Sequence, residues 1–150
     1  MKLMTIGYEG LTSKEFFAIL RANKVQKIID VRELPLSHKP GFSKSALSLA
    51  AKTRKIAYVH VPELGTSREI RHDYHADHNW KRFARRFKAS LNKHEEAVEE
   101  LARLVTRERC CLVCFEADAL QCHRSIVAER VAGVIGSSLT VMHLKAPGLE

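Results

Sequence analysis

The chain has 150 residues, 45% of them hydrophobic, which is enough for one domain with a buried core that needs no disulfide. No apolar stretch approaches the roughly 20 residues of a membrane-spanning helix, which argues against membrane association. The formal net charge of +8 favours anionic partners.

The cysteines bear on the compartment in which the chain works. Three of the four, Cys110, Cys111 and Cys114, fall in one expected strand, which suits reduced thiols better than a secreted disulfide framework. Cys110 and Cys111 are expected to be core residues. The N-terminus lacks the layout of a signal peptide. We therefore expect a cytoplasmic protein.

Strands and helices alternate along the first half of the chain. Thr12 with Glu15 three residues later matches a capping box and predicts a helix that reaches Ala22. Pro35 and Pro40 predict a loop after the second strand. The expected elements are strand 3–7, helix 13–22, strand 25–31, helix 43–55 and strand 56–61.

The second half continues the alternation after an irregular stretch. Residues 66–79 are polar and weakly periodic, which predicts a long excursion with one helical turn, and excursions of this length are often functional. The expected elements that follow are helices 80–91 and 93–107, strand 110–115, helix 125–135 and strand 139–144.

This alternation predicts one α/β domain over residues 1–150, with a mainly parallel sheet of about five strands and helices on both faces. The layout is Rossmann-like, but no G-x-G-x-x-G motif follows the first strand and no G-K-[ST] motif is present, so no cofactor is expected. Ligands of such folds bind at the carboxyl ends of the strands. Polar or turn-forming residues gather there, namely Tyr8, Asp30, Arg32, Gly65 and Glu116.

A thiol, an imidazole and a guanidinium follow one another at a strand–loop–helix junction, in Cys122, His123 and Arg124. A helix start favours anions. Cys122 is a candidate nucleophile or a packed cysteine, and His123 is a candidate acid, base or phosphate contact. Arg124 suits phosphate or carboxylate recognition, although an ion pair with Asp30 or Glu116 would place it equally well.

Asp30 and Arg32 alternate along a strand end, so their side chains are expected on the same side of the sheet. Together they could orient a polar substrate. Glu116 with Asp30 could supply paired carboxylates for acid–base catalysis, or both could belong to a network of ion pairs that holds the loops.

A metal site is a further alternative. Cys114, Cys122 and His123 could form a zinc set with one histidine of the 72–78 segment. However, no C-x-x-C pair has a matching second pair, and Cys111 and Cys114 diverge within their strand. No metal is therefore expected.

The stretch 81–93 carries six basic residues and no acidic one. Such a face attracts polyanions and would make binding sensitive to salt, but a solvated helix face in a basic protein is the simpler interpretation. The candidate nucleic-acid contacts are Lys81, Arg82, Arg85, Arg86 and Lys88.

The chain resembles the domain of unknown function family 488 over nearly its whole length. The resemblance is carried by Thr5 to Gly10, by Asp30-Val31-Arg32 with Pro35, Ser37 and Phe42, and by Cys114-Phe115-Glu116 with Cys122-His123-Arg124. It implies a compact α/β domain of prokaryotic type and no settled activity. The positions it marks are Tyr8, Asp30, Arg32, Pro35, Ser37, Phe42, Gly65, Glu116, Cys122, His123 and Arg124.

Three functional hypotheses follow, and the sequence does not decide whether the chain is an enzyme. The first is the binding or processing of an anionic, phosphate-bearing substrate, such as a nucleotide or nucleic acid, at the carboxyl ends of the strands. The others are a nucleic-acid-binding module that uses the 81–93 helix and a thiol redox sensor that uses Cys122. The expected catalytic residues are Cys122, His123, Asp30 and Glu116, and the expected substrate-binding residues are Arg124, Arg32, Tyr8, Ser37 and Gly65.

Overall fold

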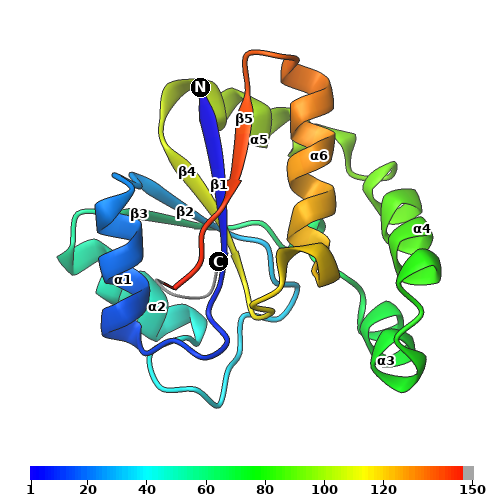
Figure 1. Ribbon diagram of the computed structural model, residues 1–150, viewed down its shortest axis with the longest axis horizontal. Coiled ribbons are helices and arrows are strands. Elements are labelled where there is room, and N and C mark those ends of the chain that lie inside the picture. Colours follow the sequence, from blue (N-terminus) through cyan, green and yellow to red (C-terminus); the bar gives the residue numbers. More distant parts are fainter. Residues whose placement is uncertain (147–150) are drawn as a thin grey trace.

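The computed structural model describes residues 1–146, and its five-stranded sheet is parallel throughout (Figure 1). The order is β3-β2-β4-β1-β5, so β4 lies at the centre, between β1 and β2. The strands are β1 (Lys2–Gly7), β2 (Lys27–Asp30), β3 (Ala57–His60), β4 (Cys110–Cys114) and β5 (Thr140–His143). The predicted α/β class is confirmed, although the strand order is not the 3-2-1-4-5-6 order of dinucleotide-binding folds.

Helices cover both faces of the sheet. In Figure 1, α1 and α2 lie to the left of the sheet, and α6, α4 and α3 lie to its right. The helices are α1 (Ser13–Ala22), α2 (Lys44–Thr53), α3 (Arg68–Asp77), α4 (Trp80–Leu91), α5 (Glu95–Arg107) and α6 (His123–Ile135), with short 3₁₀ turns at Pro62–Leu64 and Ala119–Gln121.

Two hydrophobic layers result from this arrangement. Successive side chains of a strand point to opposite faces. Met4 and Ile28 therefore pack in the layer under α1 and α2, while Leu3 and Ile29 pack in the layer under α3, α4, α5 and α6. The sheet is buried on both sides, as a parallel sheet requires.

The parallel register aligns the carboxyl ends of the central strands. Gly7 of β1 pairs with Cys114 of β4, and Asp30 of β2 pairs with Val113. The residues that follow these strands therefore emerge side by side at one edge of the sheet. This edge carries the candidate site.

Helix α3 differs from the expected excursion with one turn, because it is a ten-residue helix. Its sequence has few apolar residues, and only Ile70 is fully buried. The Ser67 side chain caps its start by accepting from the backbone N–H of Ile70 at 3.2 Å. Ion pairs to α4, such as Asp73 with Arg86 at 2.6 Å, stabilise its exposed side. The sequence did not predict this helix because its hydrophobic residues show only weak helical periodicity.

No helix within residues 1–146 combines the length and the apolar character needed to cross a membrane.

Candidate functional site

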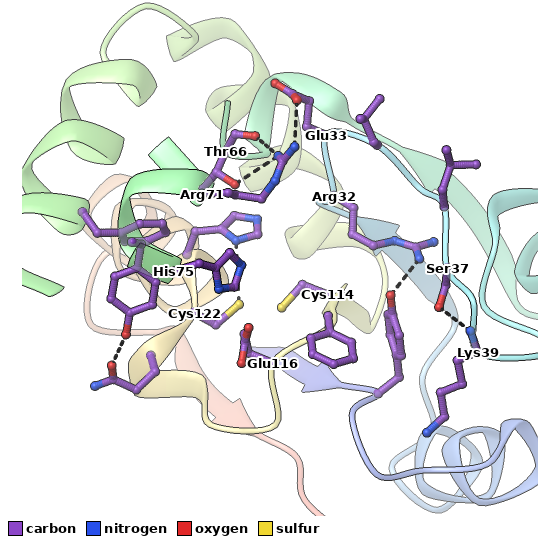
Figure 2. Close-up of a pocket in the computed structure, with 18 of the residues that line it drawn as sticks. Arg32, Glu33, Ser37, Lys39, Thr66, Arg71, His75, Cys114, Glu116 and Cys122 are labelled. Carbon is purple, nitrogen blue, oxygen red and sulfur yellow. Dashed lines mark hydrogen bonds and ion pairs between the residues drawn. The ribbon is translucent and has the colours of Figure 1, made fainter. Parts of the chain in front are cut away.

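A cavity of about 480 Å³ opens at the carboxyl edge of the sheet, between helix α3 and the segments that follow β1, β2 and β4 (Figure 2). Of the expected site residues, it brings together Tyr8, Arg32, Ser37, Glu116, Cys122 and His123. Asp30, Gly65 and Arg124 do not line it.

A cluster of sulfur and nitrogen atoms lies against this cavity. The ligand-forming atoms of Cys114, Cys122 and His123 all lie within 4.8 Å of one another. Cys114 ends β4, Cys122 occupies the N-cap position of helix α6, and His123 is the first residue of that helix. All three side chains are buried, yet all three line the cavity.

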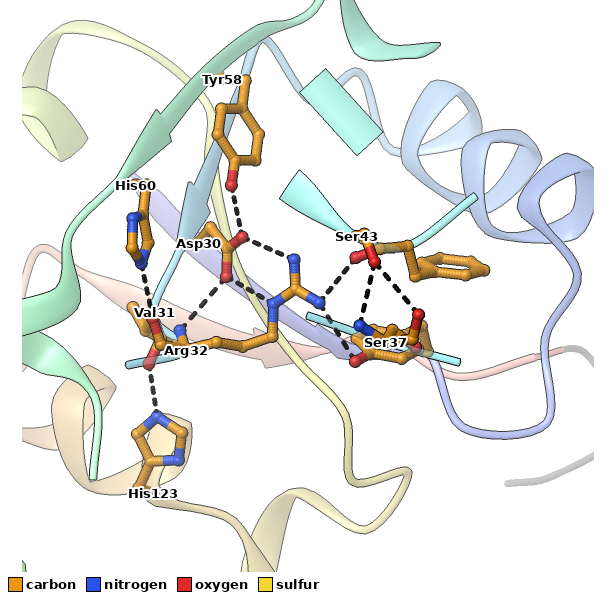
Figure 3. A network of polar contacts seen from close by, with 10 residues as sticks. Asp30, Val31, Arg32, Ser37, Ser43, Tyr58, His60 and His123 are labelled. Carbon is orange, nitrogen blue, oxygen red and sulfur yellow. Dashed lines mark hydrogen bonds and ion pairs between the residues drawn. The ribbon is translucent and has the colours of Figure 1, made fainter. Parts of the chain in front are cut away.

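The two nitrogen atoms of His123 have different partners. Nε2 lies 2.7 Å from the carbonyl oxygen of Val31 at the end of β2, and a carbonyl can only accept, so Nε2 carries the proton (Figure 3). Nδ1 lies 3.7 Å from Sγ of Cys122. Burial lowers the pKa of His123, which favours the neutral ring with the Nδ1 lone pair toward the sulfur.

The thiols at the cavity differ from each other in acidity. Burial works to raise the pKa of Cys122, but a hydrogen bond from the Cys114 thiol and the nearby Arg124 guanidinium outweigh it, so this pKa is lowered. Burial, followed by the hydrogen bond to Cys122, raises the pKa of Cys114. Away from the cavity, burial raises the pKa of Cys110 to about 11. Cys122 is therefore the more acidic thiol of the pair.

Arg124 has a different role from the direct anion binding that was expected. Its side chain is fully buried, and its guanidinium donates to the backbone carbonyls of Glu116 and Ala117 and to Oγ1 of Thr5 at 3.1 Å. The same group lies 3.1 Å from Sγ of Cys114. Arg124 thus holds the loop after β4 in place and presents positive charge to the sulfur atoms, and it forms no ion pair with Asp30 or Glu116.

Asp30 is also placed differently from a catalytic base. Its carboxylate is fully buried and accepts two hydrogen bonds from the Arg32 guanidinium, at 2.9 and 2.7 Å, and one from Tyr58 (Figure 3). The expected same-side placement of Asp30 and Arg32 is therefore confirmed. The expected pairing of Asp30 with Glu116 at the cavity is not found, because Asp30 is enclosed behind Arg32. The carboxylates that line the cavity are those of Glu33 and Glu116.

Arg32 links this buried pair to the cavity wall. Its guanidinium also donates to the hydroxyl of Tyr8 at 3.2 Å and to the carbonyl of Phe42 at 2.7 Å. The ring of Tyr8 stacks on that of Phe42 with centroids 4.5 Å apart. Ser37 lines the same wall, and its hydroxyl accepts from the backbone N–H of Lys39 at 3.1 Å.

Two glycines permit close approach of chain segments around the site. A Cβ atom at Gly65 would lie 2.4 Å from the backbone nitrogen of Glu33. A Cβ atom at Gly7 would lie 1.7 Å from the carbonyl oxygen of Glu116. Gly65 thus serves backbone packing rather than the ligand contact that was expected, and Gly7 makes room for the loop that Arg124 holds.

Of the two acidic residues expected at the site, Glu116 lines the cavity. It is half-buried, and burial together with the nearby Glu9 carboxylate raises its pKa. The neighbouring Glu9 carboxylate accepts from the backbone N–H of Ala117 at 3.0 Å. A carboxyl group in such surroundings is suited to exchanging a proton with a bound molecule.

Sequence reasoning missed several residues of the cavity, chiefly those from helix α3. Arg71, Tyr74 and His75 line it from one side of that helix. Their i, i+3, i+4 spacing would have revealed them had the helix been recognised. Lys39, in the loop before α2, lines the opposite side (Figure 2).

The basic residues of α4 divide into paired and unpaired groups. Arg82 and Arg86 contact the acidic side chains of Asp77 and Asp73, each at 2.6 Å. Within residues 1–146, three exposed cations of the predicted set form no ion pair, namely Lys81, Arg85 and Lys88.

Comparisons with known proteins place the chain in a family. No curated protein and no solved structure matches it. A family model described as "Domain of unknown function DUF488" matches residues 12–131, which is most of the chain. The motifs around Asp30, Cys114 and Cys122 lie within the matched range. The chain therefore belongs to the DUF488 family.

Proposed function

We propose that the protein binds a small phosphate-bearing molecule in the cavity at the carboxyl edge of its sheet and processes it at the cluster of Cys114, Cys122 and His123. One observation carries the proposal: a single cavity combines cationic side chains, aromatic walls and this thiol–imidazole cluster. Its volume of about 480 Å³ is typical of small-molecule sites, which span roughly 300–1,000 Å³.

Two cations supply the attraction for an anionic group. The charge of Arg32 is already balanced by its two hydrogen bonds to Asp30. Lys39 forms no ion pair among residues 1–146, and its Nζ lies 5.9 Å from the centre of the Phe42 ring. Arg71 donates to the carbonyl of Thr66, and its one ion pair, with Glu33, is long at 3.4 Å, so most of its charge is not neutralised. Lys39 and Arg71 are therefore the residues proposed to bind the phosphate.

The remaining walls favour a ligand that also has an apolar or aromatic part. Tyr8, Tyr74 and Phe115 line the cavity, and Phe115 meets Tyr8 edge to face with ring centroids 5.5 Å apart. Aromatic rings of this kind stack on planar groups, including nucleobases. A mononucleotide has both the charge and the ring that this cavity suits.

Calorimetric titration of the chelator-treated 150-residue chain with inorganic phosphate and with adenosine monophosphate tests this proposal. Lys39→Ala and Arg71→Ala should each weaken binding at least about tenfold, since a charge-assisted hydrogen bond contributes roughly 1.5–3 kcal/mol. Lys52→Ala on α2 and Arg103→Ala on α5 are matched controls on exposed helix faces and should bind like the wild type. Absence of binding by the wild type, or equal binding by all four variants, would contradict the proposal.

A second candidate function is nucleic-acid binding by helix α4. Lys81, Arg85 and Lys88 are exposed and recur at i, i+4 and i+7, so they form one cationic stripe. The acidic residues of α3 neutralise Arg82 and Arg86 beside it. This reduces the charge available to a polyanion and makes the cavity the better-supported site.

We also propose that the chain works in the reducing environment of the cytoplasm. Cys110, Cys111, Cys114 and Cys122 are all free thiols, although two of them lie in contact. Proteins of oxidising compartments generally use neighbouring cysteines as disulfides.

A further inference from the structure

The separation of the donor atoms in the cavity cluster matches that of a metal site. Sγ of Cys122 and Nδ1 of His123 are 3.7 Å apart. A tetrahedral zinc ion with zinc–sulfur and zinc–nitrogen bonds of about 2.3 and 2.0 Å holds such atoms about 3.5 Å apart. Sγ of Cys114 lies within 4.8 Å of both. One ion between the three atoms therefore requires only small movements of buried side chains.

The hydrogen bond from Nε2 of His123 to a backbone carbonyl is a second indication of a metal site. Histidines that bind metals generally donate their second ring N–H to a carboxylate or a backbone carbonyl, which orients the ring and its free nitrogen. Nε2 of His123 makes this bond to Val31 at 2.7 Å. Nδ1 is thereby directed at the sulfur of Cys122, where an ion would be bound.

Charge balance around the cluster also suits a divalent ion. Two thiolates would neutralise the two charges of the ion, while the neutral imidazole adds none. The buried Arg124 guanidinium contacts Sγ of Cys114 at 3.1 Å and favours the anionic form of sulfur that binds metals. Thiolate and imidazole ligands select zinc-like transition metals over magnesium or calcium.

We propose that Cys114, Cys122 and His123 bind one zinc-like divalent ion whose fourth coordination position faces the cavity. Three protein ligands with an open position are typical of catalytic zinc, which activates a water molecule or polarises a substrate oxygen. This deepens the proposed function by naming a metal for the same site, and it makes Cys122 a ligand rather than a free nucleophile. Metal binding can be measured without any anionic ligand.

The His75 side chain distinguishes an open site from a closed one. It lines the cavity from α3 and is exposed. If the fourth position is open, His75→Ala should leave zinc affinity within about threefold of the wild type. Removal of a true ligand should weaken zinc binding by at least about tenfold, because even residues that only hydrogen-bond to a ligand have effects of that size. A large loss in His75→Ala would overturn the open site.

The test is zinc titration of the reduced, chelator-treated 150-residue chain in competition with a chromophoric chelator. We expect one ion per chain and at least about tenfold weaker binding in Cys114→Ser, Cys122→Ser and His123→Gln. Cys110→Ser and Cys111→Ser replace buried cysteines of the same strand outside the cluster and should bind like the wild type. Absence of zinc binding by the wild type, or equal losses in cluster and control variants, would overturn the proposal.

A second measurement, on the cobalt-substituted wild type, does not depend on whether the variants fold. Thiolate ligation should give sulfur-to-cobalt charge-transfer absorption, and a cobalt complex without it would contradict the proposal. Phosphate titration of the metal-free chain tests the cavity separately, so failure of one proposal can be told from failure of the other.

Discussion

Nδ1 of His123 lies 3.7 Å from Sγ of Cys122, the preceding residue, at the start of helix α6. The contact depends on the end of another strand. The carbonyl of Val31 after β2 accepts from Nε2 at 2.7 Å and thereby sets the orientation of the ring. The cluster of Cys114, Cys122 and His123 is thus assembled jointly by the ends of β2 and β4 and the start of α6.

Arg124 is expected to be important for stability because of the carbonyls it satisfies. Arg124→Ala would leave the carbonyls of Glu116 and Ala117 without their donor and should lower the free energy of unfolding by about 3 kcal/mol. Arg103→Ala removes only an exposed pair with Glu100 and should cost less than about 0.5 kcal/mol. Urea denaturation of both variants measures this difference, and a loss below about 1 kcal/mol for Arg124→Ala would argue against the assigned role.

Two glycines should respond in opposite ways to alanine. Gly7→Ala would place a Cβ 1.7 Å from the Glu116 carbonyl oxygen, so the loop after β4 must shift and stability should fall by at least about 2 kcal/mol. Gly133 lies inside α6, and a Cβ added there would meet nothing within 4 Å, so Gly133→Ala should stabilise by roughly 0.5–1 kcal/mol. Thermal unfolding of the pair checks both signs, and equal shifts would refute the packing argument.

Stability should fall in mild acid, in part because of His143. Burial lowers the pKa of His143, whose Nδ1 lies 2.6 Å from Oγ1 of Thr5. The unfolded chain therefore takes up a proton at a higher pH than the folded chain does. The contribution is present above the ordinary histidine value of about 6.5 and is lost as the pH falls from there through the lower folded value.

Urea unfolding at a series of pH values tests this linkage. His143→Gln should have a shallower loss of stability below about pH 6.5 than the wild type, because one of its titrating groups is gone. His123, whose pKa burial also lowers, should keep part of the slope in the variant. An identical slope in variant and wild type would contradict the assignment.

The cationic stripe of α4 predicts only weak, salt-sensitive nucleic-acid binding. Arg85→Glu and Lys88→Glu should abolish any binding of DNA or RNA seen at low salt, since both side chains are exposed. The same changes should leave binding of adenosine monophosphate unaltered, because neither residue lines the cavity. Fluorescence anisotropy at rising salt measures the first effect, and salt-resistant binding that survives both changes would exclude this surface.

Features that depend on local pattern were predictable from the sequence. The capping box at Thr12 is present, with Glu15 and Thr12 bonding each other's backbone N–H groups. Strand alternation correctly placed Asp30 and Arg32 on one side. The start of α6 lies at His123, two residues before the predicted start, within the usual variation of helix boundaries.

Features that depend on the orientation of side chains and loops in the folded protein could not be predicted from the sequence. Arg124 could point outward to a ligand or inward to the loop, and only the path of the loop after β4 decides this. The contact between Cys114 and Cys122 requires the same loop to return to its own strand. Arg71 and His75 reach the cavity because α3 packs beside it, and a helix with so few apolar residues gives a weak sequence signal.

The most direct test of the account is a chemical-shift titration of the ¹⁵N-labelled chain with adenosine monophosphate. If the cavity is the functional site, the largest amide shifts should fall on the segments that line it, around residues 32–39, 66–75 and 114–123. Shifts confined to the α4 stripe of Lys81, Arg85 and Lys88, or the absence of shifts around the cavity, would contradict it.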